Sequence, residues 1–125
     1  MKTITAILAA LSLSLAAGEA HARRPEYLSF VIHNGTRATI NYKMRWGAHG
    51  SWVNYSIAPG GMRIHAISAA HGYKGAMFSW DTDPRVGKVR PISYGYNPQQ
   101  VFDTKHGTKL RFELTPDQRF WLVPQ

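Results

Sequence analysis

The sequence has no cysteine, few acidic residues and only one long hydrophobic run. Without cysteine, the chain is neither one of the disulfide scaffolds common among small exported domains nor an enzyme with a cysteine nucleophile. Stability must therefore come from the packing of aliphatic and aromatic side chains. The largest contributors available are Trp46, Trp52, Trp80 and Trp121, each able to bury on the order of 200 Å².

Acidic residues are outnumbered by basic ones, seven Asp and Glu against fifteen Lys and Arg, which gives a net charge of +8 at pH 7. A charge of this sign attracts polyanions over about one Debye length, roughly 8–10 Å at physiological salt. Candidate partners are acidic polysaccharide, lipopolysaccharide, phospholipid headgroups and nucleic acid. The net charge alone does not distinguish among these partners. No motif in the sequence indicates a cofactor.

The long hydrophobic run lies at the N-terminus, where Lys2 precedes an apolar stretch over residues 4–17 and Ala20-His21-Ala22 forms a small-x-small cleavage site. This pattern predicts a secretory signal peptide, residues 1–22, cleaved after Ala22. The run is shorter than the about 20 residues that a stable membrane span needs. We expect a secreted or periplasmic protein whose mature part, residues 23–125, is a single domain without a transmembrane segment.

The mature part alternates polar and apolar residues with a period of two, most regularly in RATINYKMRW, residues 37–46. Such alternation predicts half-buried strands separated by Gly, Pro, Asn and Asp. The expected strands cover residues 27–33, 37–46, 51–57, 62–68, 74–81, 87–94, 99–104, 108–114 and 119–123. We expect an all-β antiparallel sandwich, Ig-like or a partly closed barrel, of about eight to nine short strands. Asn34-Gly35 predicts a two-residue hairpin turn, and His106-Gly107 a similar one.

Three segments carry a resemblance: FVIHNGTRATINYKMRW, WVNYSIAPGG and FSWDTDP. With these segments the chain resembles small exported bacterial β-sandwich domains of uncharacterised function. Their shared features are turn and core signatures that extend over most of the mature chain. The resemblance implies a fold and brings no catalytic residue with it.

Basic residues form three short rows on the expected strands. The candidate polyanion-binding residues are Arg37, Lys43, Arg45, Lys88, Arg90, Lys109 and Arg111. Two rows side by side in one sheet would make a positive patch, on which Tyr94 and Tyr96 could stack against bases or sugars. We expect instead that the rows scatter over both sheets, because an antiparallel sandwich exposes one face of each sheet to water.

Five histidines of the mature part lack metal-ligand spacing, since no two are two, three or four residues apart. Four of them, His33, His49, His71 and His106, adjoin turn residues, and His65 is expected on a solvent-facing strand side. No metal site is therefore predicted. Asp81 and Asp83 could hold a cation, although a turn in which they accept backbone amide bonds is the preferred interpretation.

A small basic hydrolase, acting on a phosphodiester or a glycan, is the alternative to a binding protein. Its candidate residues are His65, His71, Lys105, His106 and Glu113. No spacing marks these residues as a set, and there is no Gly-x-Ser-x-Gly nucleophile motif. We therefore expect a non-catalytic binding module for an anionic envelope or extracellular polymer. A structural accessory protein without a ligand is the third possibility.

Overall fold

The computed structural model describes residues 24–125, and the predicted signal peptide lies outside these residues. Nine strands and two short 3₁₀ turns make up the described part of the chain. They are β2 (Tyr27–Asn34), β3 (Ile40–Trp46), β4 (Val53–Ile57), β5 (Met62–Ser68), η1 (Ala69–His71), β6 (Ala76–Asp81), β7 (Pro91–Tyr96), β8 (Gln99–Val101), η2 (Thr104–His106), β9 (Thr108–Leu114) and β10 (Phe120–Pro124). No helix among the described residues is long and apolar enough to cross a membrane.

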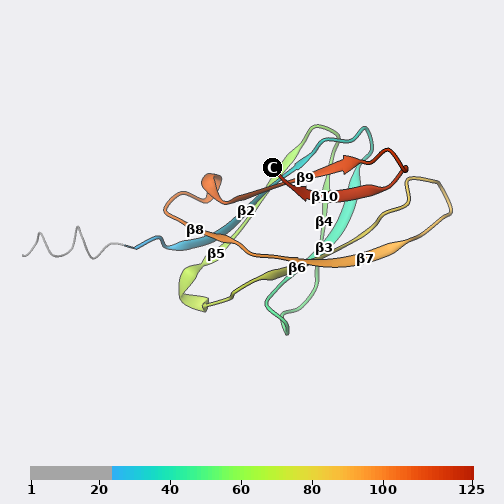
Figure 1. The fold of residues 1–125 in the computed structure, drawn as a ribbon. Coiled ribbons are helices and arrows are strands. Elements are labelled where there is room, and N and C mark those ends of the chain that lie inside the picture. The colour runs from blue at the N-terminus through green and yellow to red at the C-terminus, as the bar shows by residue number, and fades with distance from the viewer. Residues whose placement is uncertain (1–23) are drawn as a thin grey trace, which may run out of the picture.

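The strands form two sheets (Figure 1). One, here called the β2 sheet, has the order β10-β9-β2-β5, and β8 also pairs with β2. The other, here called the β3 sheet, has the order β4-β3-β6-β7. All pairings are antiparallel except that of β2 with β9, which run parallel. The prediction of an all-β antiparallel sandwich of about eight to nine strands is confirmed, apart from the parallel pairing of β2 with β9, and the sheets do not close into a barrel.

The core lies between the sheets and is rich in aromatic residues. Phe30 and Ile32 of β2 and Tyr42 and Met44 of β3 belong to one core cluster. Burial alternates along β3 as the sequence predicts, whereas β2 is buried on both of its sides. Phe30, Phe78 and Phe112 are fully buried. Trp80 belongs to the core, and Trp46 and Trp121 pack against it. Trp52 is different, because 37% of it is exposed to solvent.

Asn34-Gly35 does not form the predicted hairpin turn. The strands on either side of it, β2 and β3, belong to different sheets, so this segment crosses from one sheet to the other. The buried Asn34 side chain holds the crossing together. Its Nδ2 donates to the carbonyl oxygens of Ala38 (2.7 Å) and Ile57 (2.9 Å). Its Oδ1 accepts from the backbone amide (2.9 Å) and the hydroxyl (2.7 Å) of Thr36.

His106-Gly107 is not a hairpin turn either. β8 and β9 both pair with β2, the first antiparallel and the second parallel, and η2 redirects the chain between them. η2 also covers Ser29, whose hydroxyl donates to the carbonyl oxygen of Thr104 at 2.5 Å. A side chain at position 107 would collide with the Ser29 backbone. Glycine is therefore required there by close backbone approach rather than by turn geometry.

Candidate functional site

The outer face of the β3 sheet carries a continuous set of polar side chains. Along β3, the alternation turns Asn41, Lys43 and Arg45 away from the core. The register places Asn41 beside Ser56, and Lys43 between Asn54 of β4 and Ser79 of β6. Cross-strand neighbours on one face are in direct contact range. Amide, hydroxyl and ammonium groups are thus gathered across three adjacent strands.

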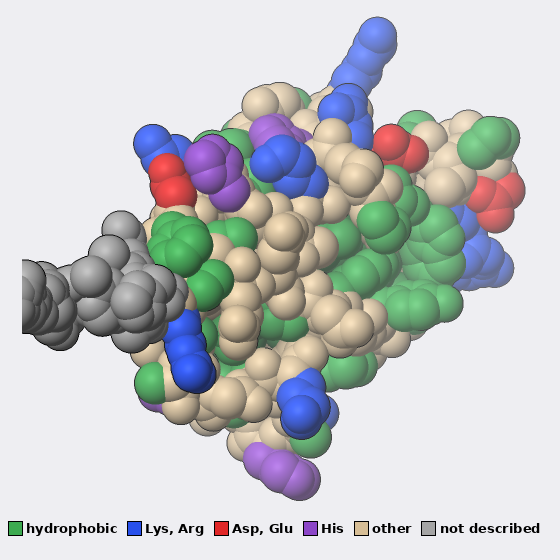
Figure 2. Space-filling view, turned by 60° about the vertical axis from the view of Figure 1, so that its left-hand side comes forward, with side chains coloured by type: hydrophobic (Ala, Val, Ile, Leu, Met, Phe, Trp, Pro, Cys, Tyr) green, Lys and Arg blue, Asp and Glu red, His purple; other side chains and the backbone are tan. Residues whose placement is uncertain are grey.

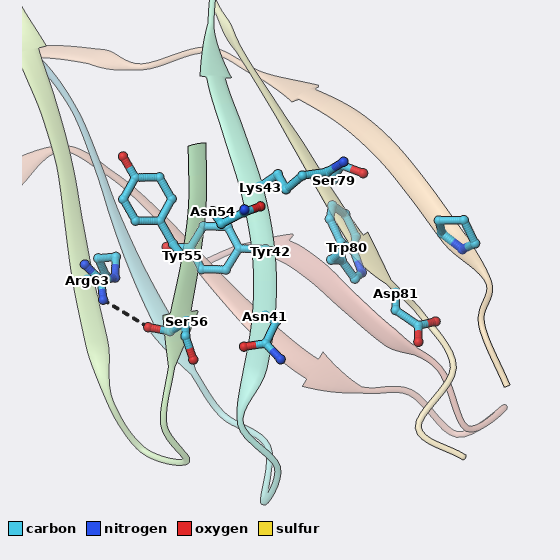
Figure 3. A pocket seen from close by; sticks show the side chains of 11 residues that line it. Asn41, Tyr42, Lys43, Asn54, Tyr55, Ser56, Arg63, Ser79, Trp80 and Asp81 are labelled. Atoms are coloured by element: carbon cyan, nitrogen blue, oxygen red, sulfur yellow. Dashed lines mark hydrogen bonds between the residues drawn. The ribbon is translucent and has the colours of Figure 1, made fainter. Parts of the chain in front are cut away.

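These side chains line an open hollow of about 830 Å³ (Figure 3). Its polar lining includes Asn41, Lys43, Asn54, Ser56, Ser79 and Asp81. In Figure 3 the Lys43 side chain extends from β3 toward Ser79 on β6. At the border with β5, the Arg63 guanidinium donates to the Ser56 carbonyl oxygen at 3.1 Å.

Trp52, which directly precedes β4, extends this polar surface with an aromatic ring. The Arg45 guanidinium carbon lies 4.7 Å from the ring centroid of Trp52, and Lys43 Nζ lies 5.7 Å from it. Neither cation forms a hydrogen bond or an ion pair with another described residue. We call this surface, made of Asn41, Lys43, Arg45, Trp52, Asn54, Ser56, Ser79 and Asp81, the Lys43 face.

The other predicted basic residues lie elsewhere. The strand predicted over 37–46 begins at Ile40, so Arg37 lies in the crossing loop and shares no strand face with Lys43. Lys88 and Arg90 were expected on a strand, but β7 begins at Pro91 and both lie in the loop before it.

Lys109 and Arg111 are on β9, in the β2 sheet. Arg111 Nε lies 3.7 Å from Glu113 Oε2 in an exposed ion pair. Figure 2 shows Lys and Arg side chains dispersed singly over the face it displays. The basic residues therefore lie on separate surfaces: Lys43 and Arg45 share the outer side of β3, whereas Lys109 and Arg111 share one side of β9 in the other sheet.

Tyr94 and Tyr96 lie at an open edge of the sandwich rather than on the Lys43 face. On β7, Tyr94 pairs with the buried Phe78, which places both tyrosines on the inner side of the sheet. The Tyr94 ring lies 5.9 Å from that of Trp121, and the Tyr96 hydroxyl donates to the carbonyl oxygen of Leu122. Burial raises the pKa of Tyr96. These two side chains connect the edges of both sheets.

Asp81 and Asp83 accept backbone amides, as the turn interpretation predicts. Asp81 Oδ1 accepts from the amides of Asp83 (2.9 Å) and Arg90 (2.8 Å). Asp83 accepts from the amide of Arg85 and from its guanidinium, at 2.8 Å and 3.0 Å. These bonds to Arg85 lower the pKa of Asp83 to about 2. Within residues 24–125, no group of three or more His, Asp or Glu residues is placed to hold a metal ion.

His65 is buried, and its predicted position on a solvent-facing strand side is wrong. Its Nε2 hydrogen-bonds to the hydroxyl of Tyr42 at 2.6 Å, and its ring packs edge-on against Tyr55. Burial lowers the pKa of His65 to about 4, and the positive charge of Arg63 acts in the same direction. Burial also raises the pKa of Tyr42. The imidazole serves here as a polar contact between the sheets.

The sequence did not single out five members of the Lys43 face as site residues: Trp52, the amides Asn41 and Asn54, and the hydroxyl residues Ser56 and Ser79. The alternation of β3 and β4 could have found the two amides, because it puts them on the same side as Lys43. No pattern distinguishes Trp52 from the three tryptophans of the interior.

No family model and no curated protein matches the chain. Among solved structures, the chain is similar to an NMR structure of a protein from Eubacterium rectale, with a TM-score of 0.52 and 16% sequence identity. The similarity covers 80% of this chain and 90% of the other. At this identity, the likeness shows that the two proteins share a fold.

Proposed function

We propose that this protein is an exported, non-catalytic binding module and that the Lys43 face binds an acidic polysaccharide. One observation carries the proposal. Lys43 and Arg45 have no acidic partner among the described residues, and both lie against the exposed ring of Trp52. Export rests on the signal-peptide pattern of residues 1–22.

The chemistry of the Lys43 face suits a polymer that carries both hydroxyl groups and negative charges. Asn41, Asn54 and Ser79 offer both donors and acceptors, which is what sugar hydroxyls require. The Trp52 ring provides a flat apolar surface of the size of a sugar ring. Lys43 and Arg45 provide the positive charge that an acidic sugar needs.

Nucleic acid fits this surface less well. Proteins that bind single strands stack successive bases on several aromatic rings inside a basic groove. The Lys43 face has one aromatic ring exposed, Trp52, and it includes the carboxylate of Asp81. A sugar polymer needs no row of stacking rings, and its hydroxyl groups can donate hydrogen bonds to the Asp81 carboxylate.

Hydrolysis needs groups that the Lys43 face lacks among the described residues. The polar residues that line it include one carboxylate, Asp81, and no histidine. Asp81 already accepts two backbone amides in its turn. Glycoside hydrolysis typically requires a pair of carboxyl groups at the scissile bond. Binding without reaction is therefore the function that this surface supports best.

The test compares two variants of equal net charge, Lys43→Gln and Lys109→Gln, for binding to alginate, a polymer of uronic acids. Both lysines are exposed, one on each sheet. Lys43→Gln should weaken binding about fivefold, or about 1 kcal/mol, and Lys109→Gln should leave it unchanged. Equal losses would mean that only net charge matters. Stronger binding to lipopolysaccharide or DNA than to alginate would contradict the choice of polymer.

A further inference from the structure

A second hollow, of about 650 Å³, adjoins the Lys43 face beyond Arg45. It is formed by the loop after β3, the segment that leads into β6, and the end of β7. Its lining includes Arg45, Tyr73, Lys74, Gly75, Gly95 and Asn97. The two hollows lie one after the other along β3, since the first includes Asn41 and Lys43 and the second Arg45 and Gly47. At roughly 3.3 Å a residue, positions 41 to 47 span about 20 Å.

Three glycines allow the segments around this hollow to pack closely against one another. A Cβ at Gly95 would lie 3.1 Å from Met77 Sδ, and one at Gly75 would lie 3.3 Å from the Tyr96 carbonyl oxygen. Gly47 has a φ of +66°, and a Cβ there would lie 2.9 Å from the Tyr73 ring. The Gly47 amide donates to the Gly75 carbonyl oxygen at 2.9 Å, which connects the two loops. Glycine is thus required at these positions by the close approach of neighbouring atoms.

Arg45 lacks a protein acceptor at this position. Its Nε is buried and has no hydrogen-bond partner among the described residues. Buried polar groups in proteins are almost always hydrogen-bonded, and a charged donor without an acceptor is costly. Stacking on Trp52 holds the guanidinium in place but provides no acceptor for it.

Lys74 adds a second positive charge to the wall of the hollow. It forms no hydrogen bond or ion pair with the rest of the described chain, and the described lining contains no Asp or Glu. Asn97 provides an amide beside these cations. The hollow therefore combines two uncompensated cations with the amide of the exposed Asn97, an arrangement complementary to an oxyanion.

We propose that this hollow binds the carboxylate of a uronic acid unit, with Arg45 and Lys74 as its cationic ligands. The inference rests on the proposed function, because the same polysaccharide chain would continue from the Lys43 face along β3. The guanidinium fork of arginine matches the two oxygens of a carboxylate. Arg45, at the boundary of the two hollows, would select acidic over neutral sugar units.

The experiment follows the amide and Arg45 Nε–H signals of the ¹⁵N-labelled protein during titration with glucuronate, with glucose as the neutral control. Glucuronate should produce saturable shifts at Arg45, Lys74, Gly75 and Gly95 in the millimolar range, and glucose should not. Arg45→Gln should weaken glucuronate binding at least tenfold and Lys74→Gln about threefold. Lys109→Gln, which has the same net charge, should not weaken it.

Three results would overturn the inference: no glucuronate shifts around the hollow, equal shifts with glucose, or unchanged affinity in Arg45→Gln. An equal response to inorganic sulfate would overturn the assignment to a sugar carboxylate, because the hollow would then accept any oxyanion. The same experiments distinguish a failure of this inference from a failure of the proposed function. Alginate binding that depends on Lys43, without glucuronate binding in the hollow, would leave the polysaccharide face standing and remove this site. Glucuronate binding without alginate binding would support the site in the hollow and contradict the proposed polysaccharide-binding function of the Lys43 face.

Discussion

The Tyr42 hydroxyl lies 2.6 Å from His65 Nε2, across the interface between the two sheets. Tyr42 belongs to β3, the strand whose opposite side carries Lys43, so this pair also anchors the candidate binding face to the core. His65 is only 5% exposed, and its burial lowers the pKa of the imidazole to about 4. Folding therefore opposes the protonation of His65.

The first prediction concerns acid stability. The pKa of His65 is 6.5 before folding and about 4 after it, so its contribution is complete above pH 6.5 and is lost as the pH falls toward 4. The loss amounts to about 3 kcal/mol of unfolding free energy. Urea unfolding at pH 7 and pH 4 should show it in the native protein. His65→Gln should lack this component, and an identical pH dependence in both proteins would contradict the assignment.

The second prediction concerns the crossing between the sheets. Asn34→Ala removes four hydrogen bonds and leaves the buried carbonyl of Ile57 without this donor. We expect a loss of at least about 2 kcal/mol in unfolding free energy. The exposed Asn54→Ala is the matched control and should change stability by no more than about 0.5 kcal/mol. Similar melting temperatures for the two variants would refute the structural role of Asn34.

The third prediction concerns the turn at Asp83. Hydrogen bonds from Arg85 hold the pKa of Asp83 at about 2, below the ordinary 3.8. Their stabilising effect is present above pH 3.8 and is lost as the pH falls through 2. Arg85→Gln should raise the pKa of Asp83, measured by NMR titration of its carboxyl carbon. Arg111→Gln, beside Glu113, is the control and should leave Asp83 unaffected.

The fourth prediction concerns Trp52. Trp52→Ala should weaken alginate binding at least tenfold, because it removes the ring that holds Lys43 and Arg45 in place. The melting temperature should change little, since the ring lies outside the core cluster. Tyr27→Ala is the control, because both residues are 37% exposed and Tyr27 lies in the β2 sheet. Equal binding by both variants would exclude Trp52 from the site.

Alternation predicted much of the fold, including the inward direction of Tyr42 and Met44 and the outward direction of Lys43. This succeeded because the side chains of a strand alternate between its faces regardless of what it pairs with. Pairing itself depends on contacts distant in sequence. Asn34-Gly35 has the composition of a hairpin turn, yet the side-chain amide of Asn34 donates to the carbonyl oxygen of Ile57, 23 residues along the chain. Local sequence could not have predicted that bond.

For two residues in the region of the candidate site, local sequence also failed to predict whether the side chain is buried or exposed. His65 was assigned to the solvent side because it alternates with Arg63, and the hydroxyl that makes its burial possible comes from Tyr42 in the other sheet. Trp52 has the large apolar side chain typical of a core residue, but it lies just before an edge strand and its ring packs against the cationic groups of Lys43 and Arg45. Only the arrangement of both sheets distinguishes these cases.

The most direct test of the account is an NMR shift map of the ¹⁵N-labelled protein with an alginate oligosaccharide. Binding at the Lys43 face predicts that the largest shifts occur at Asn41, Lys43, Asn54 and Ser79. At the same oligosaccharide concentration these shifts should be much smaller in Trp52→Ala. Shifts centred on Lys109 and Arg111 would contradict the proposal that the outer face of the β3 sheet is the binding surface. An absence of shifts at millimolar oligosaccharide would contradict it as well.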